Sequence, residues 1–473
     1  MIARLAIAAA VLFLVAGPAQ AASDLRAEGR FFKDAQGRVV ILRGVNMAGD
    51  SKVPPFTPIT SAELLDPLAD WGMNIIRFLF TWEAYEPEPG VYDESYLDYY
   101  EQVLDWAAER GIWVILDIHQ DTWSRYANSG CGEGFPAWAV TAEVPLHAPD
   151  NSVANCEAWS IMGLLDPEQE ITWDRFYNDT EGVRTRYLAM MDRLAERFGA
   201  HPALAGYDLL NEPFGLEDTE ILPLYEDAAA VVRARDPDGI IFVSPSIVTS
   251  VGLPSRMDRP SFDNFAFAPH FYDALVALTR SYFGQSFAKP FDGMARVARG
   301  WGVPLLLGEF GGPGVGTNIP AAVDALYRQI DVHLAGATQW VYTPGWDPVL
   351  KDGWNGEDFS ITDDTGTPRV NFRVRPYARR VAGEPTRMAA TYAGFLSVNS
   401  VVVEWNHDPA TGETEIFAPV ADLFPNGYKI ERSGADLTCA YDADERLYTC
   451  ASPTAGPKRV KIRACVNFLG ICF

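Results

Sequence analysis

Short apolar runs recur along the chain at roughly even intervals, and each ends at a polar residue, Gly or Pro. Runs of this kind are typical of strands buried in a parallel sheet, with the polar residue at the carboxyl end of the strand. The first run follows a small hairpin that begins at residue 31. The predicted strands lie within residues 39–46, 73–80, 112–118, 204–210, 240–243, 265–268, 303–308 and 336–342. We therefore predict eight buried strands.

Helical patterns separate these runs, with apolar residues at three- and four-residue steps in segments such as 95–110 and 183–198. The expected N-caps are Ser61 and Ser95, and the expected helix stops are Gly111 and Gly199. Eight strands that alternate with helices over about 350 residues predict an α/β fold, the (β/α)8 TIM barrel. A doubly wound open sheet is the alternative, but it would not normally need eight strands that each deliver a polar tip.

The pattern changes near residues 383–385. Beyond this point come short alternating segments, at 401–405, 413–417 and 428–431, separated by Asp, Gly and Pro turns. This alternation predicts a small antiparallel β-sandwich of about 85 residues. We assign residues 22–383 to the barrel and residues 384–473 to the C-terminal β-sandwich domain.

The first 21 residues have a pattern of their own. Arg4 precedes an apolar run at residues 7–16, and the small-x-small sequence that ends at Ala21 follows. This is typical of a secretory signal peptide cleaved after Ala21. The run is shorter than the roughly 20 residues that a spanning helix needs, although a retained N-terminal anchor is the alternative. We therefore expect a secreted protein.

Export also fits the cysteines, because an even number in an exported chain favours disulfides over metal ligation. Their grouping suggests local pairs, although sequence does not fix the connectivity. The suggested pairs are Cys131 with Cys156, Cys439 with Cys450, and Cys465 with Cys472.

The formal net charge of −25 limits the partners. An acidic protein repels phosphate backbones, which argues against nucleic acid. It also argues against electrostatic docking to anionic lipid. A lipid substrate would therefore be held by apolar contacts.

Candidate chemistry lies at the strand ends, because TIM-barrel active sites lie at the carboxyl face of the strands. Scattered structural polar residues would not be expected to converge on one rim. The polar residues at the predicted strand ends are Asn46, Lys52, Arg77, Asp117, His119, Gln120, Asp121, Asn211, Glu212, His270, Tyr272, Glu309, Gln339 and Trp340.

Two glutamates, Glu212 and Glu309, end the fourth and seventh predicted strands. Double-displacement glycoside hydrolysis needs one carboxylic acid that protonates the leaving oxygen and one carboxylate that attacks the anomeric carbon. The two must differ in pKa, and Arg77 and Tyr272 could hold Glu309 ionised. A retaining mechanism predicts carboxyl groups about 5 to 5.5 Å apart. A salt-bridged structural carboxylate is the alternative for either one alone.

Other strand-end residues have alternative interpretations. Asp117, His119 and Asp121 have a metal-ligand type of spacing, but without a second His-rich cluster we expect no metal. Arg77 and Asp117 could form a structural ion pair on the rim instead of contacting sugar. Trp340 could belong to the core, although a strand-end indole in such a site more often stacks on a pyranose.

These residues have a family resemblance. Asn211-Glu212-Pro213 together with Gly308-Glu309-Phe310 resembles the retaining barrel glycosidases of glycoside hydrolase family 5. Further motifs are similar to those of endoglycoceramidases, which release an intact oligosaccharide from the ceramide of glycosphingolipids. These motifs lie at residues 52–55, 117–121, 134–138, 342–344, 352–358 and 375–383.

The resemblance implies that Glu212 is the acid/base and Glu309 the nucleophile of a monomeric enzyme without a cofactor. It also implies a glycosphingolipid substrate and transient contact with a membrane or micelle surface. The residues expected to bind the sugar next to ceramide are Lys52, His119, Asp121, Asn211, Tyr272 and Trp340. We add Arg77, Asp117 and His270 as further candidate contacts.

The aglycone should meet an apolar wall after strands six to eight, although helix core is the alternative for those residues. The candidates are Leu275, Val276, Leu278, Tyr282, Phe283 and Phe287. One departure affects the substrate: residues 122–126 and 131–133 are also similar to relatives that cleave simple glucosides of ceramide or sterol. A β-glucosidase for glucosylceramide or steryl glucosides is therefore the alternative function. A catalytically silent, lectin-like barrel is a third hypothesis.

Overall fold

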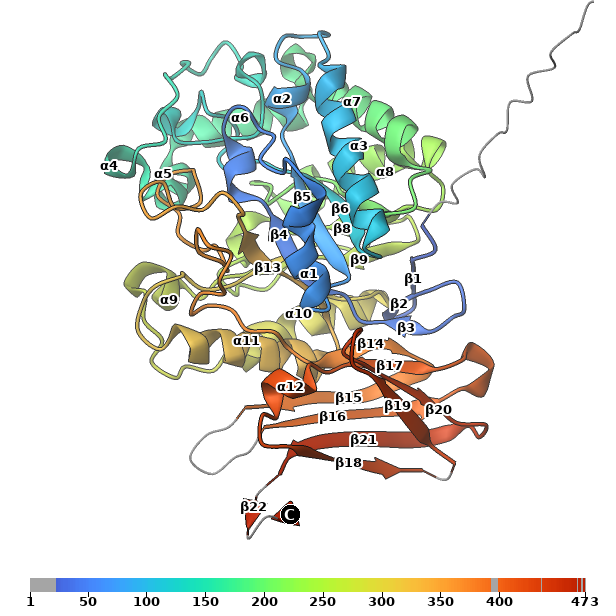
Figure 1. The fold of residues 1–473 in the computed structure, drawn as a ribbon. Helices are drawn as coiled ribbons and strands as arrows, with labels where there is room; N and C mark the ends of the chain where they lie inside the picture. Colours follow the sequence, from blue (N-terminus) through green and yellow to red (C-terminus); the bar gives the residue numbers. More distant parts are fainter. Residues whose placement is uncertain (1–22, 393–398, 435, 466, 469–470, 473) are drawn as a thin grey trace, which may run out of the picture.

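The computed structural model describes residues 23–392, 399–434, 436–465, 467–468 and 471–472, which form a barrel and a β-sandwich (Figure 1). Eight parallel strands form one sheet in the order β11-β13-β4-β5-β6-β7-β8-β9. A parallel bridge between Phe267 and Leu305 and the parallel pair β10–β12 join the two ends of this sheet. The sheet therefore closes, which confirms the TIM barrel and excludes the open sheet.

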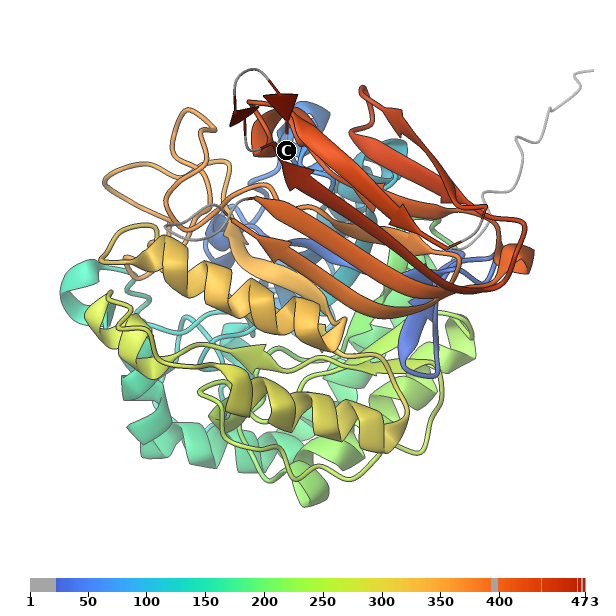
Figure 2. The same ribbon diagram turned by 90° about the horizontal axis from the view of Figure 1, so that it is seen from below.

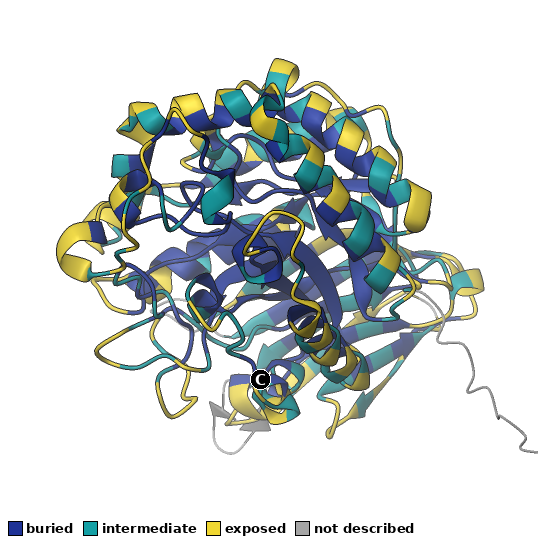
Figure 3. Cartoon of the chain, turned by 90° about the horizontal axis from the view of Figure 1, so that it is seen from above, coloured by how far each residue is buried: buried dark blue, intermediate teal, exposed yellow. Residues whose placement is uncertain are grey.

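Each of the eight predicted runs overlaps a barrel strand. The strands are β4 (Arg43–Met47), β5 (Ile75–Phe80), β6 (Trp113–Ile118), β7 (Leu204–Asp208), β8 (Ile240–Val243), β9 (Phe265–Phe267), β11 (Leu306–Leu307) and β13 (Gly336–Tyr342). The short strands β10 (His270–Phe271) and β12 (Glu309–Phe310) follow β9 and β11. The strands are buried on both faces, as expected for a parallel sheet covered by helices (Figure 3).

The helices of the barrel units lie around the barrel with their apolar faces inward. They are α1 (Asp66–Asp70), α3 (Glu94–Glu109), α7 (Val183–Phe198), α8 (Leu222–Arg235), α10 (Ala288–Trp301) and α11 (Ile319–His333). Further helices lie in the connecting loops: α2 (Trp82–Tyr85), α4 (Val153–Cys156), α5 (Trp159–Leu165), α6 (Pro167–Tyr177) and α9 (Ala274–Thr279). The predicted helix at 183–198 is confirmed.

Of the two predicted N-caps, the structure contradicts Ser95 and places Ser61 at the start of a helix. Helix α3 is capped by Asp93, whose carboxylate accepts from the backbone N–H of Ser95, so the prediction of Ser95 as the cap is wrong. An ionised carboxylate is the stronger acceptor for a helix N-terminus. Ser61 occupies the N-cap position of a 3₁₀ helix, η2 (Ala62–Leu65), as predicted, but its side chain makes no capping bond to it.

One unit of the barrel lacks the expected helix. Between β8 and β9, residues 244–264 are all described and contain only a 3₁₀ turn, η7 (Ile247–Thr249). Prolines and a glycine interrupt this stretch at Pro245, Gly252, Pro254 and Pro260, and proline removes helix hydrogen bonds. A groove of about 510 Å³ lies between this connection and α10.

The sandwich pairs a seven-stranded sheet, β1-β2-β3-β14-β17-β20-β19, with a four-stranded sheet, β15-β16-β21-β18 (Figure 2). The N-terminal strands are β1 (Arg26–Glu28), β2 (Phe31–Lys33) and β3 (Val39–Val40). The C-terminal strands are β14 (Tyr377–Val381), β15 (Gly383–Thr391), β16 (Ser400–His407), β17 (Thr414–Phe417), β18 (Tyr428–Ser433), β19 (Thr438–Asp442), β20 (Leu447–Ala451) and β21 (Gly456–Ala464). The remaining elements are α12 (Val420–Leu423) and a last hairpin, β22 (Asn467–Phe468) with β23 (Ile471–Cys472).

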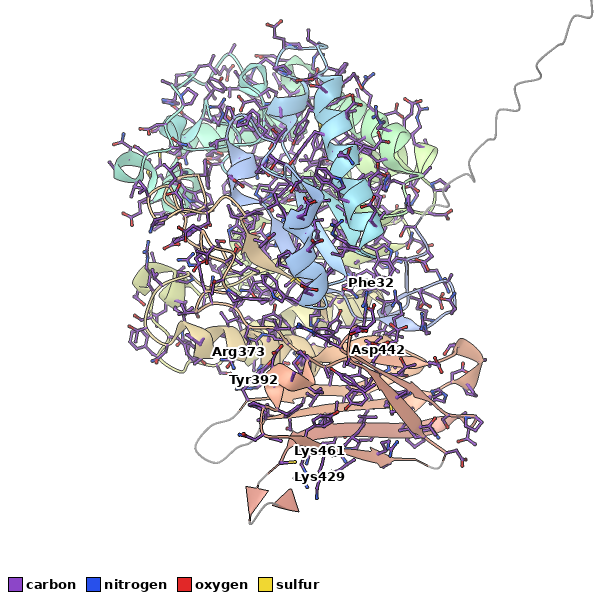
Figure 4. The ribbon with its side chains drawn as sticks, in the orientation of Figure 1. Phe32, Arg373, Tyr392, Lys429, Asp442 and Lys461 are labelled. Carbon is purple, nitrogen blue, oxygen red and sulfur yellow. A yellow bond between two sulfur atoms is a disulfide. The ribbon has the colours of Figure 1, made fainter. Side chains whose placement is uncertain are left out.

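The predicted hairpin, β2 with β3, is therefore also an edge of the sandwich, because β3 pairs with β14. Lys429 and Lys461 lie on the four-stranded sheet, and Arg373 and Tyr392 lie where barrel and sandwich meet (Figure 4). The guanidinium of Arg373 is 4.5 Å from the ring centre of Tyr392. The two units thus share chain segments and side-chain contacts.

Two of the suggested disulfides are present, Cys131–Cys156 and Cys439–Cys450. The third suggested pair involves the side chain of Cys472, which lies outside the described residues. Among the helices of the described chain, none has the length and apolarity needed to cross a membrane. The predicted signal peptide also lies outside the described residues.

Candidate active site

The carboxyl ends of the barrel strands deliver the predicted polar residues to one buried cluster. Glu212 follows β7, which is the fourth barrel strand, and Glu309 begins β12 at the end of the seventh. Strands β10 and β12 pair in a register that sets His270 beside Glu309. Glu212 has a φ of +39°, a left-handed conformation that is uncommon for a glutamate and is often found at functional sites.

The two glutamates lie close together across the barrel mouth. One carboxylate oxygen of each, with a ring nitrogen of His270, lie within 4.8 Å of one another. Nδ1 of His270 is 3.0 Å from Oε1 of Glu212 and 3.6 Å from Oε2 of Glu309. The imidazole therefore stands between the two carboxyl groups and contacts Glu212 directly.

Arg77 lies at the bottom of the site. Its guanidinium is completely buried and donates to five side-chain oxygens, those of Asn46, Asp117, Asp208, Asn211 and Glu309, over 2.7 to 2.9 Å. Tyr272 donates its hydroxyl to the other oxygen of Glu309 over 2.9 Å. Both contacts expected for Glu309 are therefore present.

The electrostatics of the two glutamates differ. Burial, with the nearby Asp121 carboxylate, raises the pKa of Glu212 to about 8. Burial also raises the pKa of Glu309 above its ordinary value, although His270 and Arg77 act against this. Arg77 therefore favours the ionised form of Glu309, as expected, but burial outweighs it in the net shift of the pKa.

Burial lowers the pKa of His270 below its ordinary value. At neutral pH the site therefore contains a neutral imidazole in contact with a protonated Glu212. A carboxylic acid that keeps its proton near pH 7 is suited to donate it to a leaving oxygen.

A second cluster lies beside the glutamates. Nζ of Lys52 is 2.5 Å from Asp121, and lies 4.5 Å from the ring centre of Trp340. The ring of His119 is parallel to the indole of Trp340 at 5.5 Å, with Nδ1 2.7 Å from Asp117. The structure thus brings Lys52, His119, Asp121 and Trp340 together, as the sequence predicted.

The predicted sugar contacts Asp117, Arg77 and Asn211 make their hydrogen bonds within the protein. Both oxygens of Asp117 are used, one by Arg77 and one by His119, and the side chain is fully buried. This favours a positioning role for Asp117 and Arg77, and their contact with sugar stays a prediction. Asn211 accepts from Arg77 and donates to the carbonyl of Gln120.

Gln339 does not join the cluster. Its amide accepts from Tyr327 on α11 and donates to the carbonyl of Asn371, on the outer side of β13. Successive side chains of a strand point to opposite faces, so Gln339 and Trp340 cannot both face the barrel mouth. Gln339, which belongs to the polar strand-end residues but not to the candidate sugar contacts, therefore does not converge on the site with the others.

Sequence reasoning missed three carboxyl groups. Asp208 pairs with Arg77 inside a strand, Glu357 lies 3.4 Å from Lys52, and Glu133 lies 3.6 Å from His119. A signal was available for Asp208, because a charged residue in a buried strand needs a partner of opposite charge. Glu133 and Glu357 come from loops whose course the local pattern does not predict.

Within the part of the chain that the structure describes, two groups of residues have the geometry to hold a metal ion, and both belong to these clusters. They are His119 with Asp121 and Glu133, and Glu212 with His270 and Glu309. In the first, the Lys52 ammonium already neutralises Asp121 and would repel a cation. Asp117 bonds the other nitrogen of His119, so the alternating Asp-His-Asp spacing does not converge on one point.

A closed barrel with two glutamates at the tips of its fourth and seventh strands defines a glycoside hydrolase. The chain belongs to glycosyl hydrolase family 5: residues 33–345 match the family model described as Cellulase (glycosyl hydrolase family 5). Residues 375–463 match the model described as the glycoside hydrolase family 5 C-terminal domain.

Comparison with individual relatives shows which members of the family this chain resembles. Endoglycoceramidase I of Rhodococcus hoagii is 27% identical over an alignment that covers 94% of this chain and 89% of that protein. The structure of endo-glycoceramidase II from a Rhodococcus species in complex with ganglioside GM3 superposes with a TM-score of 0.76 at 28% identity, covering 93% of this chain and 100% of that one. A glucosylceramidase of Cryptococcus neoformans is 36% identical, with 78% of this chain and 79% of that protein covered. The chain is therefore an endoglycoceramidase-like family 5 enzyme.

Proposed function

We propose that the protein is a secreted, retaining endo-β-glycosidase that cleaves the bond between the oligosaccharide and the ceramide of glycosphingolipids. The observation that carries the proposal is the close approach of Glu212 and Glu309, with oxygens within 4.8 Å of each other. Such a short separation fits retaining enzymes, whose carboxyl groups lie about 5 to 5.5 Å apart, better than inverting ones at about 6.5 to 9.5 Å. The ganglioside complex of the Rhodococcus relative supports the lipid substrate.

The mechanism follows from the two environments. Glu212, protonated at neutral pH, gives its proton to the glycosidic oxygen as Glu309 attacks the anomeric carbon. Ceramide leaves as the alcohol, and the sugar stays bonded to Glu309 as an ester. Glu212, now ionised, takes a proton from water, which attacks the same carbon and releases the sugar. Two inversions give net retention.

Around this chemistry, Arg77 and Tyr272 neutralise the charge that returns to Glu309 when the ester is hydrolysed. Lys52, His119 and Asp121 offer charged donors and acceptors to sugar hydroxyls, and Asn211 adds an amide beside Glu212. Trp340 is only 4% exposed, so any stacking on a pyranose would use the part of the ring that faces the mouth.

Fewer residues are available to form the aglycone wall than the sequence suggested. Val276 and Phe287 are buried in the core, whereas Leu275, Leu278 and Phe283 are 45%, 70% and 70% exposed. These three lie on and after α9, which follows directly on His270 and Tyr272 of the site. We place the alkyl chains of the substrate, and a transient contact with the lipid surface, against these three side chains.

Secretion is supported by the apolar run and cleavage pattern of residues 1–21. The second candidate function is a β-glucosidase for glucosylceramide or steryl glucosides, supported by the 36% identity to a glucosylceramidase.

One assay separates the two functions. Purified protein is incubated with lactosylceramide, glucosylceramide and a steryl glucoside, with Glu309→Gln as the inactive control. Release of intact lactose supports the endoglycosidase, whereas release of glucose from only the latter two supports the glucosidase. Failure on all three, with an aryl glycoside cleaved, would reject both lipid substrates.

A further inference from the structure

Glu133 is a buried carboxyl group inside the site that the mechanism does not use. It is fully buried, and neither of its carboxylate oxygens has a hydrogen-bond partner among the described residues. Oε1 lies 3.6 Å from Nε2 of His119, which also lacks a partner there. Leaving buried polar atoms unpaired is unfavourable, and such exceptions in a folded protein call for an explanation.

The chain is shaped to place this side chain where it is. Asp121 and Glu133 form an antiparallel bridge with backbone bonds of 2.8 and 3.2 Å. The glycines on either side of Glu133 permit the approach. A Cβ on Gly132 would lie 2.4 Å from the carbonyl oxygen of Ser124, and one on Gly134 would lie 2.5 Å from that of His119. No other residue type fits at these two positions without movement of the backbone.

Cys131, two residues before Glu133, makes two further contacts that fix this segment. Cys131 forms the disulfide with Cys156, and its carbonyl accepts from the amide of Asn355 over 2.8 Å. The segment that carries Glu133 is therefore fixed to the third strand end, to the α4 loop and to the loop after β13. These contacts fix the position of Glu133 in the site.

The geometry indicates what Glu133 does. Nε2 of His119 lies 3.6 Å from Glu133 and 3.7 Å from Asp121, which is too far for a direct hydrogen bond. Distances of this kind suit a hydroxyl group or a water between the groups. Nδ1 of His119 is occupied by Asp117, and Asp121 is occupied on one side by Lys52. Nε2 of His119 and one carboxylate oxygen each of Asp121 and Glu133 therefore lie within 4.8 Å of one another, and the Asp121 oxygen nearest to His119 also accepts from Lys52.

We propose that Glu133 is a positioning residue, which holds the imidazole of His119 and the carboxylate of Asp121 in the orientation that binds one hydroxyl of the sugar at the catalytic glutamates. The proposal rests on the proposed function, because that sugar is its ligand. It adds a residue from the segment where the motif pattern departs from other endoglycoceramidases. Glu133 acts through His119 and Asp121, so it should affect binding of the sugar more than the chemical step.

The protonation state of Glu133 determines which substitution can mimic it. Burial raises its pKa to about 8, with Asp121 and Asp117 acting in the same direction and His119 and Lys52 against it. At neutral pH it is therefore a neutral acid with one donor and one acceptor, as a glutamine amide also has. The charged and titratable groups that face it are Lys52, Tyr96, Asp117, His119, Asp121 and Arg125.

The experiment compares Glu133→Gln with Glu133→Leu, using 4-nitrophenyl β-lactoside or β-glucoside, whichever the wild type cleaves. The control is Glu86→Gln. Glu86 is equally buried, but its oxygens accept from Trp82 and from the backbone of Gly90. We expect Glu133→Leu to raise KM about tenfold, on the scale of a hydrogen bond to a charged group, with little change in kcat. Glu133→Gln should bring KM back to within about threefold of wild type at pH 7.

A pH series gives a second readout that a merely structural role would not move. In the wild type, 1/KM should fall above pH 8 as Glu133 ionises next to Asp121, and this fall should be weaker in Glu133→Gln. Superimposable pH profiles would overturn the proposal, even if Glu133→Leu failed to fold. So would a normal KM in Glu133→Leu, or equal losses in the two Glu133 variants at pH 7. A wild type that cleaves the aryl glycoside but no glycolipid would refute the proposed function and leave this test intact.

Discussion

The guanidinium of Arg77 donates to Oε1 of Glu309 over 2.8 Å at the floor of the barrel mouth. The same guanidinium also pairs with Asp117 and Asp208, so one buried cation faces three carboxyl groups. Arg77 therefore links Glu309, the proposed nucleophile, to two carboxyl groups buried in the barrel. Orientation of Glu309 and stability of the fold depend on the same side chain.

Arg77→Met should destabilise the protein strongly. Removing one partner of a buried ion pair typically costs about 3–5 kcal/mol, because the remaining charges stay buried without a partner. Arg77→Lys should restore little, since a point charge cannot replace a five-donor fork. Thermal melts measure the effect, with Arg235→Lys as the control, because Arg235 pairs with Asp192 on the surface. A Met variant as stable as the wild type would show that Arg77 does not anchor the cluster.

The barrel was predictable from sequence because each strand is a continuous apolar run that ends at a polar residue. The rule holds for Asn211-Glu212 and for Glu309, which reach the same point from distant segments. It fails for Gln339, because a strand-end position does not say which face a side chain takes. Gln339 and Trp340 are adjacent in β13, so their side chains point to opposite faces of the strand.

Other features depend on contacts that no local pattern contains. The N-terminal hairpin reads as a separate element, yet β3 pairs with β14 more than 330 residues later. Glu133 enters the site because a loop doubles back onto Asp121. The pKa of Glu309 could not be judged from its expected neighbours alone, since burial outweighs them.

The activity should depend on pH through both glutamates. Glu212 must be protonated to act as the acid, so kcat/KM should fall as pH rises through its pKa of about 8. Glu309 must be ionised to attack, so activity should also fall on the acid side, at a pH above that of an ordinary glutamate. The two groups are close, so the apparent values belong to the pair. The profile is measured with a soluble alkyl glycoside, whose leaving group needs the proton, and an alkaline limb that persists in Glu212→Ala combined with Glu133→Gln would contradict the assignment.

The exposed apolar residues after β10 should matter only for lipid substrates. Leu278→Ser combined with Phe283→Ser removes several methylenes from the surface, each of which contributes about 0.8 kcal/mol when buried. We expect KM for the glycolipid to rise about tenfold or more, with KM for an aryl glycoside unchanged. Val332→Ser on α11 is the control, because Val332 is 63% exposed on an outer helix. Equal losses on both substrates would exclude a role in aglycone binding.

The last prediction separates the roles of the two catalytic glutamates. Glu309→Gln should abolish turnover, because an amide cannot form the glycosyl ester. Glu212→Ala should lose about 10²- to 10⁴-fold on glycolipids, whose alcohol leaving group needs a proton. An aryl glycoside with an activated leaving group should lose much less in its first step.

In Glu212→Ala the ester at Glu309 should therefore accumulate with the aryl substrate. Added azide should relieve it by attacking the anomeric carbon, since the missing side chain leaves room and no base is needed. The product should be the β-glycosyl azide, because a second inversion restores the original configuration. Proton NMR of the product reads the anomer directly. An α-azide from Glu212→Ala, or relief by azide in the Glu309 variant but not in Glu212→Ala, would show that the two roles are reversed.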